Sequence, residues 1–377
     1  MTLDMKRNWA NQPLGMRDVY PEQAKRRRQL ENQLLTFFEQ RGYDMVSSGA
    51  FEYVDTLLRG RTPLEAEDWV QLFDPSGRAV ALRPDMTPSI ARMAAPLIAG
   101  GRQEVRWCYA ERVYRRTNDP ASLSWLSGKA AESTQVGVEW IGQGDVDTDC
   151  ELIAVCQHAM QSLKLSDWQM VVSHALFAPA FLKAFGTPEG ALGGLLGLLS
   201  QGDYVGFRRQ FAQYHIDSDV LTLLGSLNPY EPDSFSPELK GRFEGQPSGD
   251  LVLSVWGDLL QFADLLKQRK LNHQLTFDLT LHRELAYYTG MVFEVFTTGV
   301  GAPIALGGRY DNLLTEFGAA SPAVGFTFEV ERLLSVVTDG EWLTPSAVPV
   351  ARLDAATGET QDGRKSETTE QREGETC

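Results

Sequence analysis

Residues 132–142 read ESTQVGVEWIG, and the interpretation of the whole chain starts from this stretch. Its composition is that of a β-strand, so Gln135, Gly137 and Glu139 share one face. A rise of about 3.3 Å per residue places the two polar side chains roughly 13 Å apart. That spacing suits a small polar ligand, since a carboxylate pairs with an ammonium or imidazole group and an amide hydrogen-bonds. A solvent-facing strand with a bulge at Gly137 is the alternative, and the spacing alone favours it.

The segments around this strand predict an α+β fold. A strand is expected at 103–116, joined to 132–142 by a polar loop long enough to suggest a functional or disordered segment. Further strands are expected at 46–51, 70–73, 79–82, 168–173, 275–281, 291–297 and 304–306, and helices at 21–42, 87–99, 148–163 and 327–337. Residues 176–270 are helical in pattern and rich in Gly and Leu, which predicts an inserted helical domain between the two parts of the core, 1–175 and 271–338. The acidic tail, 339–377, has the composition of a disordered segment.

Composition excludes several classes of protein. The chain has 377 residues, and 35 Lys and Arg against 50 Asp and Glu give a net charge of −15. This balance argues against binding to nucleic acid mainly through phosphate neutralisation. Four scattered cysteines and five histidines show no metal-ligand spacing, so no metal site or cofactor is expected and the cysteines are predicted to be reduced. The polar N-terminus and the absence of an apolar run of 18 residues predict a cytoplasmic protein without a membrane span.

Two further motifs contain candidate ligand-binding residues. Asp85 and Thr87 lie at a strand-to-helix turn, where both can accept a hydrogen bond from a ligand amine; Thr87 before Pro88 is equally suited to cap the helix. In the segment 281–294, Arg283 can bind a carboxylate with two parallel hydrogen bonds. Tyr287 or Tyr288 can line a pocket, and a hairpin with core aromatics is the alternative.

Residues 307–311 read Gly-Gly-Arg-Tyr-Asp. The two glycines can allow a close approach of the backbone to a ligand or another strand. The Lys-Ser/Thr of a P-loop is absent, as are the Gly-x-Gly-x-x-Gly and Gly-x-Ser-x-Gly patterns. These familiar phosphate-binding and nucleophile motifs therefore give no support for a nucleotide site or a serine hydrolase.

Taken together and in order, the motifs resemble the catalytic core of class II histidine–tRNA ligases over about residues 12–338. The matching segments are 14–21, 82–87, 113–115, 135–139, 283–294, 307–311 and 322–326. The resemblance implies a class II aminoacyl-tRNA synthetase-like antiparallel sheet flanked by helices, with a helical insertion. It also implies a histidine site. Its residues would be Asp85, Thr87, Gln135 and Glu139 around the amine and ring, Arg115 and Arg283 near the carboxylate, and Tyr287 or Tyr288 on the pocket wall.

The chain departs from the ligases where they bind ATP and tRNA. Thr117 replaces the glutamate that reads adenine, and Glu329 replaces a glycine that leaves room for ATP. The ligase pattern after Arg283 loses two residues, and an acidic tail follows where the ligases have an anticodon-binding domain. The resemblance therefore implies that the histidine half of the site is kept, whereas the ATP and tRNA parts of the ligase function are altered.

This combination resembles the family of regulatory subunits of short-form ATP phosphoribosyltransferase. The resemblance implies a non-catalytic protein of histidine biosynthesis that forms a homodimer within a hetero-oligomer, activates a short catalytic subunit and binds histidine as the feedback effector, without tRNA. Closure of the loop 117–131 over the ligand is the expected moving element. Two alternatives stay open: a ligase-type enzyme that forms histidyl-adenylate, and a scaffold that has lost histidine binding.

Overall fold

Two ten-residue strands, β5 (Val105–Tyr114) and β6 (Glu132–Ile141), pair in antiparallel register along their whole length and form the centre of the fold. The structure is a computed structural model that describes residues 12–13, 15–61, 69–116, 131–216, 219–283 and 286–337. The chain divides into two units after residue 346, and every element below lies in the first of them.

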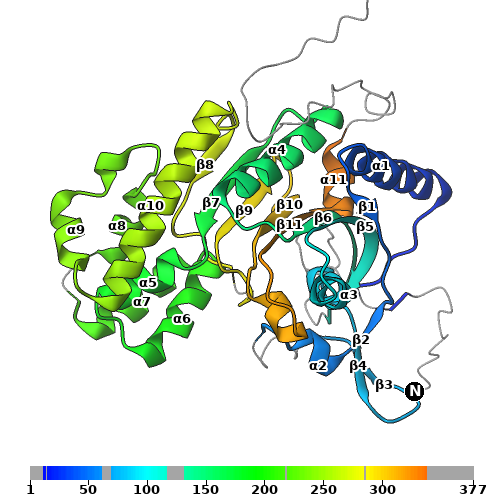
Figure 1. Cartoon of the computed structure of the whole chain (residues 1–377), viewed down its shortest axis with the longest axis horizontal. Helices are drawn as coiled ribbons and strands as arrows, with labels where there is room; N and C mark the ends of the chain where they lie inside the picture. The colour runs from blue at the N-terminus through cyan, green and yellow to red at the C-terminus, as the bar shows by residue number, and fades with distance from the viewer. Residues whose placement is uncertain are drawn as a thin grey trace, which may run out of the picture. The chain divides into compact units, whose positions relative to one another are not determined.

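The large sheet has eight strands in the order β1-β5-β6-β11-β10-β9-β7-β8 (Figure 1). The remaining strands are β1 (Asp44–Met45), β7 (Gln169–His174), β8 (Leu275–Phe277), β9 (Met291–Phe296), β10 (Ala305–Arg309) and β11 (Ala323–Glu329). Interior pairs are antiparallel, whereas the two edge pairs, β1–β5 and β7–β8, are parallel. The predicted α+β architecture is therefore present, with a mixed sheet in place of a purely antiparallel one.

Helices cover the two faces of this sheet unequally. On one face pack α1 (Pro21–Glu39), α4 (Val146–Ser162) and α11 (Val330–Val336), which share the main core with the even-numbered side chains of β6. On the other face, α3 (Thr87–Ala99) packs against the short helix η6 (Leu313–Phe317) in a smaller core. The predicted apolar stripe of α1 is buried in the main core, where each Leu or Phe side chain contributes about 1.5–3 kcal/mol. The odd-numbered side chains of β6 face the smaller core and the candidate site.

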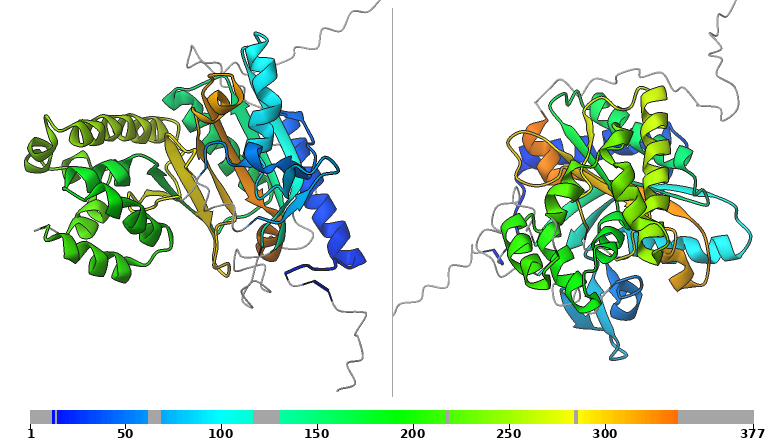
Figure 2. Two further views of the ribbon diagram at one scale, coloured as in Figure 1. Left: turned by 90° about the horizontal axis from the view of Figure 1, so that it is seen from below. Right: turned by 90° about the vertical axis from the view of Figure 1, so that its left-hand side faces the viewer.

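Residues 177–268 form a cluster of helices beside the end of the sheet that carries β7 and β8 (Figure 2). They are α5 (Phe177–Ala184), α6 (Glu189–Ser200), α7 (Tyr204–Phe211), η4 (Ala212–Tyr214), α8 (Val220–Ser226), η5 (Pro232–Ser234), α9 (Pro237–Phe243) and α10 (Pro247–Gln268). Their positions coincide with the predicted insertion, whose status as a separate domain stays a prediction. None of the described helices is long and apolar enough to cross a membrane.

A second, small sheet has the order β2-β4-β3, and the short helix α2 (Val54–Leu57) follows its first strand. Its strands are β2 (Phe51–Tyr53), β3 (Gln71–Phe73) and β4 (Ala79–Leu82). The predicted turn between β3 and β4 is present, because Asp74 Oδ1 accepts hydrogen bonds from the backbone N–H groups of Ser76 and Arg78, both at 2.9 Å. The sheet leaves Phe51 and Phe73 exposed.

Several predicted boundaries were wrong. Residues 46–50 are not a strand, because the chain leaves β1 and enters the small sheet only at Phe51. Residues 327–329 belong to β11, where they pair with 135–137 of β6, and α11 begins after them. Thr87 is the first residue of α3 and does not cap it, since the cap position is Met86 and the Thr87 hydroxyl bonds elsewhere.

Candidate functional site

Glu139 is a buried carboxylate held by hydroxyl groups. It lies on β6 and is 1% exposed. Thr87 Oγ1 donates to its Oε1 at 2.8 Å, and the Tyr310 hydroxyl donates to its Oε2 at 2.5 Å. Burial raises the pKa of Glu139 to about 8, although the hydroxyls of Tyr310, Thr87 and Tyr109 act to lower it. Hydroxyls are the only described groups that favour its ionised form, so an incoming cationic group would find a buried carboxylate with no cation of its own.

Two glycines create the space for this arrangement. Gly325 pairs with Glu139 across β11 and β6, and a Cβ atom at 325 would lie 1.7 Å from Glu139 Oε2. A Cβ atom at Gly137 would lie 2.7 Å from the hydroxyl oxygen of Tyr109. Gly137 therefore makes room for the Tyr109 ring and the backbone of β11. The alternative of a solvent-facing, bulged strand was wrong, because β6 is buried and pairs regularly through Gly137.

Asp85 contacts Thr87, the residue that donates to Glu139. Its Oδ1 accepts a hydrogen bond from the backbone N–H of Thr87 at 3.1 Å, and its Oδ2 is ion-paired with Arg61. The Arg61 guanidinium also lies 5.5 Å from the ring centroid of Tyr287. Asp85 thus already has a cationic partner within the protein, and a ligand ammonium would have to share or replace it.

Arg283 lies beside the tyrosine wall, which consists of the packed rings of Tyr287 and Tyr288. Arg283 is ion-paired with Glu294 on β9, and although burial acts to lower its pKa, the neighbouring carboxylate raises the pKa above its ordinary value. The rings of Tyr287 and Tyr288 lie 4.8 Å apart, and Tyr287 meets the Tyr310 ring edge to face at 6.0 Å. Both tyrosines are buried and within electrostatic reach of Glu139. They therefore belong to the smaller core.

Gln135 and Arg115 lie near the N-terminal end of β6, away from Glu139. The Gln135 side-chain amide donates to Glu329 Oε1 at 3.0 Å, across β6 and β11. Glu329 is 2% exposed, yet its pKa is lowered: burial acts to raise the pKa, and the guanidinium groups of Arg332 and Arg115 together with Gln135 outweigh burial. The N-terminal end of β6 therefore lies beside the buried negative charge of Glu329.

All eight predicted site residues thus fall in one connected region of the structure. Sequence reasoning missed four of their partners: Arg61, Tyr109, Glu294 and Tyr310. Tyr310 lies in the Gly-Gly-Arg-Tyr-Asp motif, and Tyr109 shares a face of β5 with Trp107 and Glu111. Both positions could therefore have been selected as candidates from the sequence. Arg61 could not, because it reaches Asp85 only through the tertiary fold. Thr117, the rest of the predicted moving loop up to 130, and the acidic tail, 339–377, lie outside the described residues.

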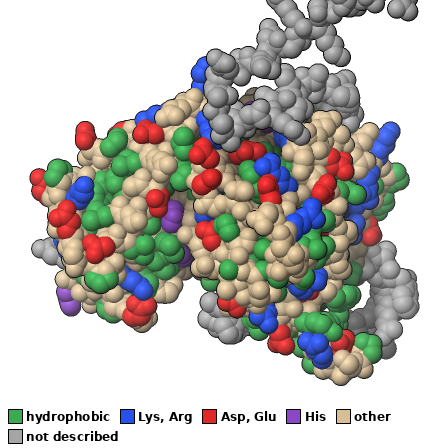
Figure 3. Space-filling view, viewed as in Figure 1, with side chains coloured by type: hydrophobic (Ala, Val, Ile, Leu, Met, Phe, Trp, Pro, Cys, Tyr) green, Lys and Arg blue, Asp and Glu red, His purple; other side chains and the backbone are tan. Residues whose placement is uncertain are grey.

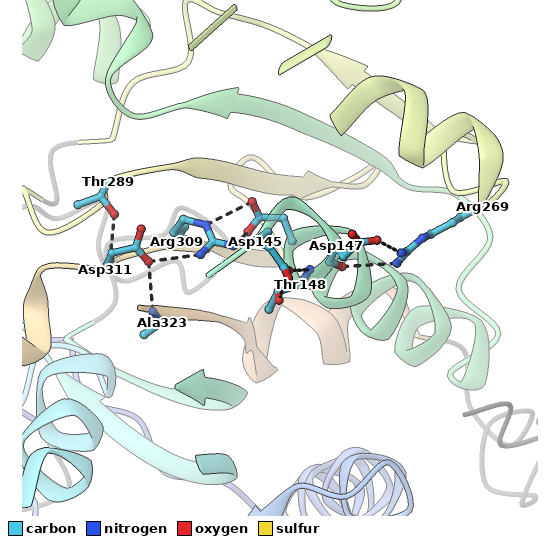
Figure 4. A network of polar contacts seen from close by, with 9 residues as sticks. Asp145, Asp147, Thr148, Arg269, Thr289, Arg309, Asp311 and Ala323 are labelled. Atoms are coloured by element: carbon cyan, nitrogen blue, oxygen red, sulfur yellow. Dashed lines mark hydrogen bonds and ion pairs between the residues drawn. The ribbon is translucent and has the colours of Figure 1, made fainter. Parts of the chain in front are cut away.

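The Gly-Gly-Arg-Tyr-Asp motif positions Tyr310 by a buried ion-pair network (Figure 4). Gly307 and Gly308 lie within β10 and not before a helix; they allow close packing against β11 and β9. Arg309 Nη2 donates to Asp149 Oδ1 and to the Asp145 carbonyl, both at 2.7 Å, and Arg309 Nη1 lies 3.3 Å from Asp311 Oδ1.

The network continues on both sides of Arg309. The backbone N–H of Asp311 donates to Thr289 Oγ1 at 2.9 Å. Thr289 directly follows Tyr288 in the chain. In the first turn of α4, Asp147 is ion-paired with Arg269 at the end of α10 (Figure 4). Polar contacts therefore extend from the residues beside the tyrosine wall to the helical cluster.

The comparisons with known proteins agree with this fold. The family model for histidyl-tRNA synthetase matches residues 15–333. The ATP phosphoribosyltransferase regulatory subunit of Moorella thermoacetica is 33% identical over 322 residues, which cover 85% of this chain and 80% of that protein. The protein of the same name from Bacillus subtilis is 30% identical over 330 residues, with 86% and 81% covered. The chain belongs to the family of ATP phosphoribosyltransferase regulatory subunits.

Solved structures place this regulatory-subunit family on the histidyl-tRNA synthetase fold. A histidine–tRNA ligase subunit from Alicyclobacillus acidocaldarius is 47% identical, with a TM-score of 0.80 over 88% of this chain and 98% of that one. An ATP phosphoribosyltransferase regulatory subunit/histidyl-tRNA synthetase from Bacillus halodurans is 28% identical, with a TM-score of 0.75 over 89% and 85%. The expected class II synthetase-like fold is thereby confirmed.

Proposed function

We propose that this regulatory-subunit family member has no catalytic activity of its own, activates a short-form ATP phosphoribosyltransferase catalytic subunit and binds histidine as the feedback effector. The observation that carries the proposal is Glu139, a buried carboxylate whose donors are hydroxyls and which lies on the same face of β6 as Gln135. The curated relatives named above are regulatory subunits of that transferase, which supports the partner.

The chemistry of the site suits the three groups of free histidine. Glu139 offers a buried carboxyl group, which a protonated imidazole or ammonium group would hold in its ionised form, and Asp85 offers a second carboxylate. Arg283 offers a guanidinium to the ligand carboxylate, in competition with Glu294. The tyrosine wall supplies apolar contact and hydroxyl groups. A site of this kind binds and releases an amino acid, and regulation then requires that histidine bind one conformation of the complex better than another, by a coupling of about 1–3 kcal/mol.

The proposal is tested by phosphoribosyl-ATP synthesis with the catalytic subunit from the same source, with and without histidine. We expect the protein to raise turnover and histidine to abolish the gain. Glu139→Gln should keep the activation and lose the response to histidine, because the amide has no charge to pair with the ligand cation. Glu244→Gln, an exposed carboxylate on the helical cluster, is the matched control and should behave as the wild type.

Each outcome separates one part of the proposal. Activation without histidine sensitivity in the wild type would keep the partner and remove the effector site. An absence of any activation would contradict the assignment as a regulatory subunit. Equal histidine sensitivity of the wild type and Glu139→Gln would remove Glu139 from the site.

A second candidate function is a ligase-type enzyme that forms histidyl-adenylate, favoured by the 47% identical relative named as a histidine–tRNA ligase subunit. The buried charge of Glu329 opposes it, since ATP brings several negative charges. Histidine-dependent exchange of pyrophosphate with ATP is its direct assay. We expect no exchange above a blank without protein.

A further inference from the structure

The segment 83–87, which contains Asp85 and Thr87, begins with a buried arginine. Arg83 is 2% exposed. A guanidinium group is charged and has five N–H donors, so its burial is costly unless the donors are paired. The contacts of Arg83 therefore indicate what its burial achieves.

All three side-chain nitrogens of Arg83 donate hydrogen bonds, and they reach two segments that are distant from it in the sequence. Nε donates to the Arg112 carbonyl at 2.9 Å, and Nη2 donates to Glu111 Oε2 at 2.6 Å. Nη1 donates to the carbonyl and the hydroxyl of Ser48 at 2.9 and 2.8 Å, and to the Gly49 carbonyl at 3.0 Å. The side chain thus joins β5 to the part of the chain that leads into β2.

The backbone of Arg83 is held on both sides as well. Its N–H donates to the Ala50 carbonyl at 3.0 Å, and its carbonyl accepts from the Tyr114 N–H at 2.9 Å. Because the side chain is buried and its nitrogens all donate within the protein, Arg83 is not placed to bind a ligand itself. Any role in the site is therefore an indirect one.

Pro84 makes the connection from Arg83 to the site residues stiff. A proline fixes its own φ at about −65° and also restricts the backbone of the residue before it. Asp85 follows directly, and its Oδ1 accepts from the Thr87 N–H at 3.1 Å. The Thr87 hydroxyl in turn donates to Glu139 Oε1 at 2.8 Å. A short, stiff segment therefore leads from Arg83 to a hydroxyl that holds Glu139.

The β5 partner of Arg83 also lies beside the candidate site. Glu111 pairs with Gln135 across β5 and β6, and its second carboxylate oxygen accepts from the Ser47 hydroxyl. Arg83 is thus connected through the segment 83–87 to Glu139 and through Glu111 to the strand position that faces Gln135.

We propose that Arg83 is a positioning residue of the histidine site: its guanidinium group fixes the segment 83–87 against β5 and so holds Asp85 and Thr87 where they meet the ligand. A lysine would keep the charge, but it donates from a single nitrogen and cannot make the same set of contacts. The inference rests on the proposed function for the identity of the ligand, whereas the placement of Thr87 against Glu139 is measurable without histidine.

A double-mutant cycle tests whether Arg83 acts through Thr87. Histidine affinity is measured by calorimetry for the wild type, Arg83→Lys, Thr87→Val and the double variant. We expect each single change to lower the affinity at least about tenfold, and the double variant to lose about as much as one single change, because the two residues act as one unit. Independent roles would multiply the two losses to at least about a hundredfold.

The titration of Glu139 gives a readout that needs no histidine. The Thr87 hydroxyl acts to lower the pKa of Glu139, so loss of its hydrogen bond raises that pKa. Carbon NMR of protein labelled at the glutamate carboxyl groups follows the titration, and Glu139→Gln assigns the signal. We expect Arg83→Lys and Thr87→Val to raise the pKa of Glu139 by equal amounts relative to the wild type.

Two further variants separate positioning from a general loss of stability. Leu195→Ala removes a fully buried side chain from α6 in the helical cluster and so lowers stability at a different place. It should leave histidine affinity and the Glu139 titration unchanged. If thermal unfolding shows that Arg83→Lys is not folded, Glu111→Gln, which weakens only the contact to Nη2, takes its place and should give smaller effects in the same direction.

Multiplied losses in the cycle would overturn the inference, as would an unchanged Glu139 titration in a folded variant of the Arg83 contacts. Equal effects of Leu195→Ala and Arg83→Lys on affinity would also overturn it, because destabilisation alone would then explain them. A wild type that binds no histidine would contradict the proposed function, and the Glu139 titration would still decide the role of Arg83.

Discussion

At the scale of single residues, the site depends on a carboxylate that the fold keeps close to neutral. The pKa of Glu139 is raised from its ordinary value of 4.5 to about 8 by burial, which three hydroxyls offset only in part. Between these two values the unfolded chain has lost the proton that the folded chain retains. Unfolding therefore releases a proton in this range, and the stability of the wild type falls as pH rises through it.

Glu139→Gln should remove this pH dependence, since the amide does not titrate. We expect the free energy of unfolding of the wild type, relative to the variant, to fall by about 1.4 kcal/mol per pH unit at most between pH 5 and about 8 and to level off above. Urea unfolding at a series of pH values measures the difference. A constant difference across the range would show that Glu139 has an ordinary pKa in the folded protein.

Gly325→Ala tests the close approach of β11 to the same carboxylate. The added Cβ atom would lie 1.7 Å from Glu139 Oε2 and would force the carboxylate out of its position. We expect histidine affinity to fall by at least about tenfold, measured by calorimetry. Gly257→Ala in α10 is the control, because nothing lies within 4 Å of its Cβ position; it should leave affinity unchanged and raise stability by about 0.5–1 kcal/mol.

At the scale of elements, the first turn of α4 holds two aspartates in contrasting roles. Asp149 pairs with the buried Arg309 of β10, whereas Asp147 pairs with Arg269 of α10 at the surface. Buried pairs are costly to break because one charge is left without a partner, and exposed pairs contribute little. The helix thus has one structural contact to the sheet and one weak contact to the helical cluster.

Asp149→Asn should therefore destabilise the protein by about 3 kcal/mol, and Asp147→Asn by less than about 1 kcal/mol. The side chain of Asp147 is 60% exposed and that of Asp149 is 9% exposed. Chemical denaturation of the two variants gives the comparison. Equal losses would show that the Arg309 network does not hold β10 against α4.

The residues that were predictable from the sequence share a local signal. The strands β5 and β6, the turn at Asp74 and the apolar stripe of α1 follow from alternation, turn chemistry and helical spacing, and the structure has them. The capping role suggested for Thr87 was wrong, because its hydroxyl donates to Glu139 on another strand, and the close packing of Gly137 against Tyr109 likewise depends on a neighbouring strand. The ion pairs of Asp85 and Arg283 were equally invisible, since they join segments that only the tertiary fold brings together.

At the scale of the whole molecule, the described surface (Figure 3) combines mixed charge with exposed apolar side chains, several of which lie on the small sheet. Acidic and basic side chains are interspersed over the face in Figure 3, despite the net charge of −15. On one face of the small sheet, Phe51 is 53%, Leu72 is 46% and Tyr53 is 37% exposed. Exposed apolar side chains gathered on one face are typical of an association surface, which fits the homodimer that the resemblance implies.

Phe51→Asp should therefore weaken self-association with little effect on stability, because about half of the side chain is exposed. Sedimentation velocity over a range of concentrations measures the dimer fraction, and thermal unfolding checks the fold. Leu251→Asp, which places the same charge at an exposed apolar position on α10, should leave the dimer fraction unchanged. An unchanged dimer fraction in Phe51→Asp would exclude this face of the small sheet from the interface.

The recognition groups of the site are bonded to one another: Asp85 to Arg61, Arg283 to Glu294, and Gln135 to Glu329. A compound entering the site must exchange each of these contacts for its own. One that offers the ammonium, the carboxylate and the ring together makes all the exchanges, whereas one that lacks a single group breaks a contact and leaves it unreplaced. Each unreplaced contact costs about 1–3 kcal/mol, so a compound that lacks one group would bind roughly 5- to 150-fold less tightly than one that has all three. Under the proposed function, this loss of affinity is what would let the site respond to histidine and not to other amino acids.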